Sequence, residues 1–226
     1  MMNVHSNRRF SPGALLVALV TLSLPPAVDA TTASAEPLPA SLRAELTGPF
    51  WHPGCPVPLS GLRLLTTPYW GFDGQRHVGQ LVVNAKAAKP LSQVFARLYS
   101  LHFPIRHMAL SDTYGPPGGQ PKDGDVTQSF ECRQAVPSPC SGGTGTGHWS
   151  NHAYGLAVDI NPSENPYVGC GQTRDPTRQV YLNRSNLRKG MVTPAVVDAF
   201  RSVGWGWGGS WTGNTKDYMH LSADGH

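Results

Sequence analysis

The chain has 226 residues, of which 39% are apolar and 14% are charged, and its formal net charge is +4 at pH 7. This modest charge does not indicate a nucleic-acid-binding protein, and the supply of aromatic residues argues against a disordered chain. The 25 glycines and 21 prolines predict a fold rich in loops.

The first residues are typical of an export signal. Arg8 and Arg9 precede an apolar stretch over 14–24, which is shorter than the roughly 20 apolar residues that span a membrane. Small residues favour cleavage after Ala30 or after Ala35. We therefore expect a signal peptide over 1–30, and a mature chain that is secreted or associated with the cell wall and has no membrane span. The remaining length, about 190 residues, suits one domain with its own core.

The mature part is predicted to begin with a flexible leader over 31–47, rich in Ala, Thr and Pro, before a domain over 48–226. Residues 48–74 mix aromatic residues with Pro and Gly, which indicates irregular packing. Strands are expected at 79–84, 105–111, 156–160 and 218–221, helices at 90–101 and 193–203, and a loop over 115–147. Because strands and helices do not alternate regularly, the prediction is a single α+β domain with a small, mainly antiparallel sheet flanked by helices.

Four cysteines in an exported chain predict two disulfides. They are Cys55, Cys132, Cys140 and Cys170. Four cysteines allow three pairings, and spacing alone does not choose among them. A zinc site built on thiolates is the alternative, but no two cysteines have the close Cys-x-x-Cys spacing that it favours.

Two segments near the C-terminus carry the residues of a hydrolytic metal site. His152 and Asp159 lie on either side of Gly155, whose freedom lets the chain turn back on itself, and Asp217 lies three residues before His220. A catalytic zinc ion uses three protein ligands, an open position for water and a nearby acid or base. We assign Asp159 to the metal and Asp217 to proton transfer. Taken singly, a histidine is more often structural and a loop aspartate more often a cap.

The pattern of these segments resembles a known enzyme family. Residues 150–159 read Ser-x-His-x-x-Gly-x-Ala-x-Asp, residues 205–211 read Trp-Gly-Trp-Gly-Gly-x-Trp, and residues 217–220 read Asp-x-Met-His. Together they resemble the zinc D-alanyl-D-alanine carboxypeptidases and L-alanyl-D-glutamate endopeptidases, the VanY-like family with the Hedgehog/DD-peptidase fold. The resemblance is strongest over 129–221.

The resemblance implies that His152, Asp159 and His220 bind Zn²⁺ and that Asp217 is the general base and acid. It also implies that Arg133, in the segment 129–133, stabilises the oxyanion formed in the reaction. Glu131 stands in that segment where the family pattern leads us to expect Asn.

Two further residues are expected near the site, Ser150 as a hydrogen-bonding partner close to the ligands and Trp207 beside the ligands or in the cleft. The alternatives are a serine that only stabilises a turn and a tryptophan that only packs in the core. From the family resemblance we favour the pairings Cys55–Cys132 and Cys140–Cys170, with Cys132–Cys140 as the competing arrangement.

The resemblance implies a zinc peptidase whose substrate is a peptidoglycan stem peptide. The N-terminal signal predicts that it is secreted, and we expect a monomer, although the sequence does not reveal the oligomeric state. The scissile bond is either the terminal D-Ala–D-Ala link or an internal L-Ala–D-Glu link, and the sequence leaves this choice open. The rival hypothesis is a catalytically silent zinc-containing binding or signalling module of the same fold, as in the Hedgehog signalling domain.

Overall fold

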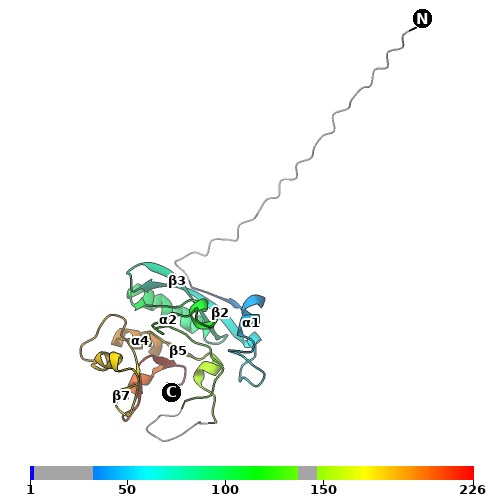
Figure 1. Cartoon of the computed structure of the whole chain (residues 1–226). Coiled ribbons are helices and arrows are strands. Elements are labelled where there is room, and N and C mark those ends of the chain that lie inside the picture. Colours follow the sequence, from blue (N-terminus) through cyan, green and yellow to red (C-terminus); the bar gives the residue numbers. More distant parts are fainter. Residues whose placement is uncertain (3–32, 137–146) are drawn as a thin grey trace.

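The computed structural model describes residues 1–2, 33–136 and 147–226, which form three small sheets with helices packed against them (Figure 1). The predicted signal peptide falls almost entirely outside this part. Across the described residues, no helix has both the length and the apolar character that a membrane span requires. The α+β prediction is confirmed, and the sheets are mainly antiparallel.

The largest sheet forms the N-terminal half of the fold. Its strands are β1 (Ser34–Pro37), β2 (Leu62–Gly71), β3 (Arg76–Asn84) and β4 (Pro104–Ile105). Strand β2 is central, since β1 and β3 pair with it antiparallel and β4 pairs with it parallel. Helices α1 (Ala40–Leu46), α2 (Ala88–Ser100) and α3 (Leu110–Tyr114) accompany this sheet, together with the short 3-10 helix η1 (Leu59–Gly61).

Two three-stranded sheets form the C-terminal half. One has the order β5 (Ala157–Asp159), β10 (His220–Ser222), β8 (Gly206–Trp207), and the other has the order β7 (Gln172–Thr173), β6 (Tyr167–Gly169), β9 (Lys216–Asp217). The helical segments here are η3 (Asn151–Tyr154), η4 (Pro176–Leu182), α4 (Pro194–Arg201) and η5 (Gly208–Ser210).

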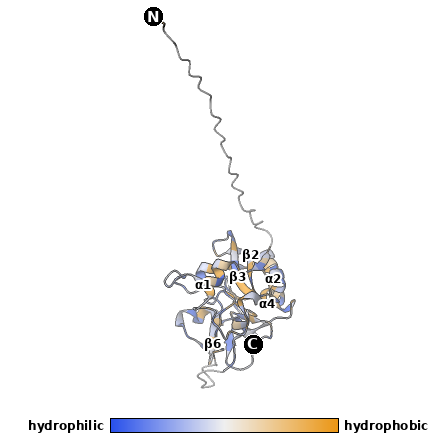
Figure 2. Ribbon diagram, turned by 90° about the vertical axis from the view of Figure 1, so that its right-hand side faces the viewer, coloured by the Kyte–Doolittle hydropathy of each residue, from blue (hydrophilic) through white to orange (hydrophobic). Residues whose placement is uncertain are grey.

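One apolar core joins the two halves. Helices α2 and α4 pack on each other, and buried hydrophobic side chains of both helices form one cluster with those of β2 and β3 (Figure 2). Val158 of β5 and Leu221 of β10 are fully buried in this same core. The central strand pair of the C-terminal half is therefore fixed to the main sheet through the interior, which gives the residues at its ends defined positions.

The expected helix over 193–203 is present as α4, and the Thr193 hydroxyl accepts a hydrogen bond from Val196 N as its cap. The expected strands over 79–84, 156–160 and 218–221 correspond to β3, β5 and β10, and the helix over 90–101 corresponds to α2.

Three expectations were wrong. Residues 34–46 form β1 and α1 instead of a flexible leader, because Leu38, Leu42 and Leu46 pack into a second apolar cluster. Within 48–74, expected to be irregular, β2 is a long strand whose middle is buried on both faces and so shows no alternation. The strand expected over 105–111 ends at Ile105, and α3 begins at Leu110.

A disulfide joins Cys55 to Cys132, as expected from the family resemblance, and excludes the competing Cys132–Cys140 pairing. Cys140 lies outside the described residues, so the pairing of Cys140 with Cys170 stays a prediction. The Cys55–Cys132 bridge connects the loop after α1 to the segment that carries Arg133.

Candidate metal centre and active site

Donor atoms of three side chains converge at the end of the β5–β10 pair where β5 ends and β10 begins. His152 lies on η3, Asp159 ends β5 and His220 begins β10, directly opposite Asp159 in the antiparallel register. His152 Nε2 lies 3.2 Å from Asp159 Oδ2 and 3.2 Å from His220 Nδ1, and His220 Nδ1 lies 3.2 Å from Asp159 Oδ1. All three side chains are buried, at 1%, 7% and 7% exposure for His152, Asp159 and His220.

The local sequence explains how these residues meet. Ser150 caps the N-terminus of η3, and its hydroxyl accepts a hydrogen bond from His152 N at 3.3 Å. Ser150 therefore lies next to a candidate ligand, as expected from the sequence. Gly155 ends η3 in the left-handed conformation at φ 63°, which returns the chain into β5. A Cβ at position 155 would lie 2.6 Å from the Asn84 nitrogen of β3, so the turn also requires the absence of a side chain.

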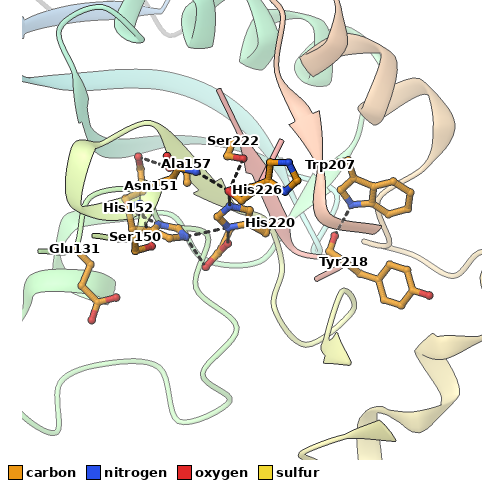
Figure 3. Close-up of polar contacts among 12 residues, drawn as sticks. Glu131, Ser150, Asn151, His152, Ala157, Trp207, Tyr218, His220, Ser222 and His226 are labelled. Atoms are coloured by element: carbon orange, nitrogen blue, oxygen red, sulfur yellow. Dashed lines mark hydrogen bonds and ion pairs between the residues drawn. The ribbon is translucent and has the colours of Figure 1, made fainter. Parts of the chain in front are cut away.

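Hydrogen bonds to main-chain oxygens fix the orientation of both imidazoles. His152 Nδ1 donates to Ser129 O at 2.5 Å, and His220 Nε2 donates to His226 O at 3.0 Å. In the neutral rings, His152 Nε2 and His220 Nδ1 therefore each carry a lone pair, and the two nitrogens face each other (Figure 3).

This donor set fits a zinc ion. Two imidazole lone pairs and a carboxylate directed at one point repel one another unless a proton or a metal cation lies between them. Donors at zinc–ligand distances of about 2.0–2.1 Å stand about 3.3 Å apart in a tetrahedral arrangement, close to the separations found here. Main-chain oxygens that hold the second ring nitrogen are the usual support of a metal-bound histidine.

The electrostatics of the three groups agree with a site for a cation. Burial opposes the charge of Asp159, yet the neighbouring imidazoles, His152 before His220, hold the pKa of its carboxyl below its usual range. Burial lowers the pKa of His220, but the hydrogen bond and the charge of Asp159 outweigh it and raise that pKa overall. A carboxylate that stays ionised beside two imidazoles provides the negative charge that a divalent cation needs.

Asp217 lies next to this centre on β9, where it pairs with Tyr167. Burial, followed by the charge of Asp159, raises the pKa of Asp217 from 3.8 to about 7. Among the buried polar side-chain atoms of the described residues, Asp217 Oδ1 is one of three without a hydrogen-bond partner. An unpaired buried carboxyl oxygen is costly to maintain, which is typical of a group kept for chemistry.

Arg133 is about one-third exposed and is held by its neighbour. Its Nε donates to Glu131 Oε2 at 2.7 Å, and its Nη1 donates to Gln134 O at 3.4 Å. Glu131, which departs from the expected Asn, thus orients the guanidinium and also lines the adjoining cleft. The positive charge of Arg133 is close enough to lower the pKa of Asp217 slightly against the larger effects of burial and Asp159.

A cleft of about 430 Å³ adjoins the centre. Asp159 and Glu131 line it together with Met219, which lies between Asp217 and the candidate ligand His220 in the sequence. Its volume falls within the range of small-ligand sites and suits a short peptide.

Trp207 does not line this cleft. Its indole packs against the main core and its Nε1 donates to Tyr218 O at 2.8 Å, and both side chains point away from the histidines in Figure 3. Trp207 thus supports the backbone next to Asp217 and does not form a cleft wall. Of the three tryptophans in this motif, Trp211 is the one in ring contact with a candidate ligand, at 6.0 Å from His220 between centroids.

Sequence reasoning missed two residues that hold the candidate ligands. Ser129, whose carbonyl oxygen orients His152, is buried and donates its hydroxyl to Ala157 O. Gln128 pairs with Asp159 through two main-chain hydrogen bonds. Ser129 and Gln128 contact His152 and Asp159 through their backbone atoms, so no side-chain motif could have indicated these contacts.

Residues 144–223 match the family model described as D-alanyl-D-alanine carboxypeptidase. The resemblance seen in the sequence is thereby confirmed. The matched segment contains His152, Asp159, Asp217 and His220, whereas Arg133 lies before it. No curated protein and no solved structure gives a significant match to the chain.

Proposed function

We propose that this protein is a secreted zinc peptidase that hydrolyses stem peptides of peptidoglycan, with the Hedgehog/DD-peptidase fold and acting as a monomer. The observation that carries the proposal is the convergence of His152, Asp159 and His220 at mutual distances of 3.2 Å beside the unpaired carboxyl oxygen of Asp217. The match to a carboxypeptidase family over these residues supports it.

His152, Asp159 and His220 would hold the metal. A zinc ion bound there supplies a Lewis acid that polarises the scissile carbonyl and lowers the pKa of water. The hydrogen bonds from His152 to Ser129 O and from His220 to His226 O keep both rings in the tautomer that such binding requires.

Asp217 would accept the proton of the attacking water at Oδ1 and return it to the leaving amine. A general acid–base works best when its pKa lies near the working pH, and burial has brought the pKa of Asp217 close to neutrality in the metal-free protein. A cation bound at the centre would lower this pKa and favour the carboxylate, which is the form that takes up the proton.

Arg133 would stabilise the negative charge that develops on the carbonyl oxygen. Its ion pair joins the guanidinium to Glu131, which lines the cleft, and the Cys55–Cys132 disulfide fixes the backbone immediately before Arg133. The cleft beside Asp159 provides the place for the peptide on either side of the scissile bond.

The test is mass spectrometry of purified muropeptides after incubation with zinc-loaded protein, with chelator-treated protein and Asp217→Asn beside it. Loss of one D-Ala identifies a carboxypeptidase, and cleavage between L-Ala and D-Glu identifies an endopeptidase. Chelation should abolish either activity and zinc should restore it. Zinc-loaded, folded protein that leaves all muropeptides intact would support the silent binding module instead.

A further inference from the structure

The residues that follow His220 form a turn that folds back onto this ligand. We call Ser222–His226 the C-terminal turn. Ala223 N donates to Leu156 O and Gly225 N donates to Ser222 O, so the turn is anchored beside β5. Figure 3 shows His226 next to His220 and Ser222, on the side of His220 away from His152.

A single oxygen atom in this turn collects three donors. His226 O accepts from His220 Nε2 at 3.0 Å, from Asn151 Nδ2 at 2.6 Å and from Ser222 Oγ at 2.9 Å. Asn151 is the residue before the ligand His152, and Ser222 is two residues after the ligand His220. The oxygen therefore ties together the two segments that carry the histidine ligands.

The carboxylate of Asp224 holds the turn in this shape. Asp224 Oδ1 accepts from Asn151 Nδ2 at 2.6 Å and from His226 N at 3.0 Å, and it lies 3.3 Å from Ser222 Oγ, whose single proton goes to the nearer His226 O. Its bond to the His226 nitrogen sets the direction of the peptide group between Gly225 and His226, and its bond to Asn151 fixes the turn to η3. A charged acceptor makes these bonds stronger than neutral ones.

Trp211 closes the outer side of the turn. Its Nε1 donates to Gly225 O at 2.6 Å, and its ring stacks on that of His226 with an interplanar angle of 23°. The same ring lies against His220. The turn is thus held from both sides, by Asp224 within and by Trp211 outside.

We infer that the C-terminal turn is a positioning element for the metal ligand His220, with Asp224 as its principal side chain. It keeps the proton of His220 on Nε2 and so presents the Nδ1 lone pair to Asp159 and His152. The inference rests on the proposed zinc site, because the tautomer of His220 affects metal binding only if His220 is a metal ligand. Partners of this kind typically contribute tenfold to hundredfold in metal affinity.

The test compares three variants with the full chain. One ends at Ala223 and so lacks the last three residues, the second is Asp224→Ala, and the third is the matched control Asp175→Ala. Asp175 is also an exposed carboxylate that caps a turn, since it accepts from Thr177 N and Thr177 Oγ1. Two readouts are measured, zinc affinity by competition with a chelator and the ¹⁵N shifts of the His220 ring in metal-free protein at about pH 8.

We expect the shortened chain and Asp224→Ala to bind zinc about tenfold to hundredfold more weakly. In both, the His220 ring should give a mixture of tautomers, and the control should match the full chain in both readouts. Because all elements from β1 to β10 remain in the shortened chain, it should stay folded, and Asp224→Ala tests the same point with the complete chain.

Unchanged zinc affinity together with a retained Nε2 proton in both variants would overturn the positioning role and leave the zinc peptidase proposal standing. A full chain that binds no zinc would instead overturn the proposed metal centre, and the inference with it.

Discussion

Replacement of Asp217 by Asn should remove activity and at the same time stabilise the metal-free protein. The carboxyl of Asp217 is buried, has an oxygen without a partner and lies close to the charge of Asp159. An amide of the same shape carries no charge, so the variant avoids the cost of ionising this group inside the protein. Loss of function and gain of stability would then come from one atom replacement.

The magnitude follows from the pKa of Asp217, which is raised from 3.8 to about 7. A group with a raised pKa in the folded state supports folding below its unfolded pKa and loses that contribution as the pH rises through its folded pKa. At 1.36 kcal/mol for each pH unit, the difference amounts to an upper limit of roughly 4 kcal/mol above neutrality. A domain of this size would melt on the order of 10 °C higher.

The assay is urea unfolding of chelator-treated wild type and Asp217→Asn between about pH 4 and pH 8. The free energies of unfolding should agree near pH 4 and separate as the pH rises, with the variant more stable. Asp198→Asn is the matched control, because Asp198 is an exposed carboxylate paired with Arg201 on α4. If wild type and Asp217→Asn keep the same difference at every pH, the reasoning about this carboxyl is wrong.

Three further predictions concern the support of the site. Gly155→Ala should lower the free energy of unfolding by about 1–3 kcal/mol more than Gly118→Ala. Both glycines have positive φ, but only at position 155 would the added Cβ contact backbone atoms. Thermal unfolding of the two variants checks this prediction. Replacing Cys55 and Cys132 by Ser should cost about 4 kcal/mol, given the 77-residue separation that the disulfide closes, and equal denaturant midpoints for the variant and the oxidised wild type would contradict it. Arg133→Met should lower kcat by about a hundredfold or more without changing zinc affinity, and steady-state kinetics beside chelator competition would separate the two effects.

The sequence allowed the candidate ligands to be chosen because their chemistry is carried by side chains. His152, Asp159 and His220 stand in motifs with fixed spacing, and the short distances among them follow once β5 and β10 pair in register. The apolar periodicity of α2 and the cap of α4 were equally local signals, and both helices formed where that pattern placed them.

What the sequence could not predict depends on contacts between distant segments. Leu42 and Leu46 lie in a stretch whose composition is typical of a linker. The short helix α1 is stabilised by packing these two side chains into the second apolar cluster, which the local sequence does not reveal. Strand β2 has no alternation because neighbouring elements cover both of its faces. The oxygens of Ser129 and His226 orient the histidines through the main chain, so no residue type at those positions signals the role.

The direct pairing of Asp159 with His220 makes assembly of the β5–β10 ladder and assembly of the donor set one event. Any ligand that binds only the folded form stabilises it in proportion to the logarithm of its concentration. If zinc is that ligand, the stability of the β5–β10 pair depends on the concentration of free zinc. Its resistance to proteolysis and to amide exchange should then increase as the zinc concentration increases. Scarcity of zinc would then shorten the lifetime of the folded protein.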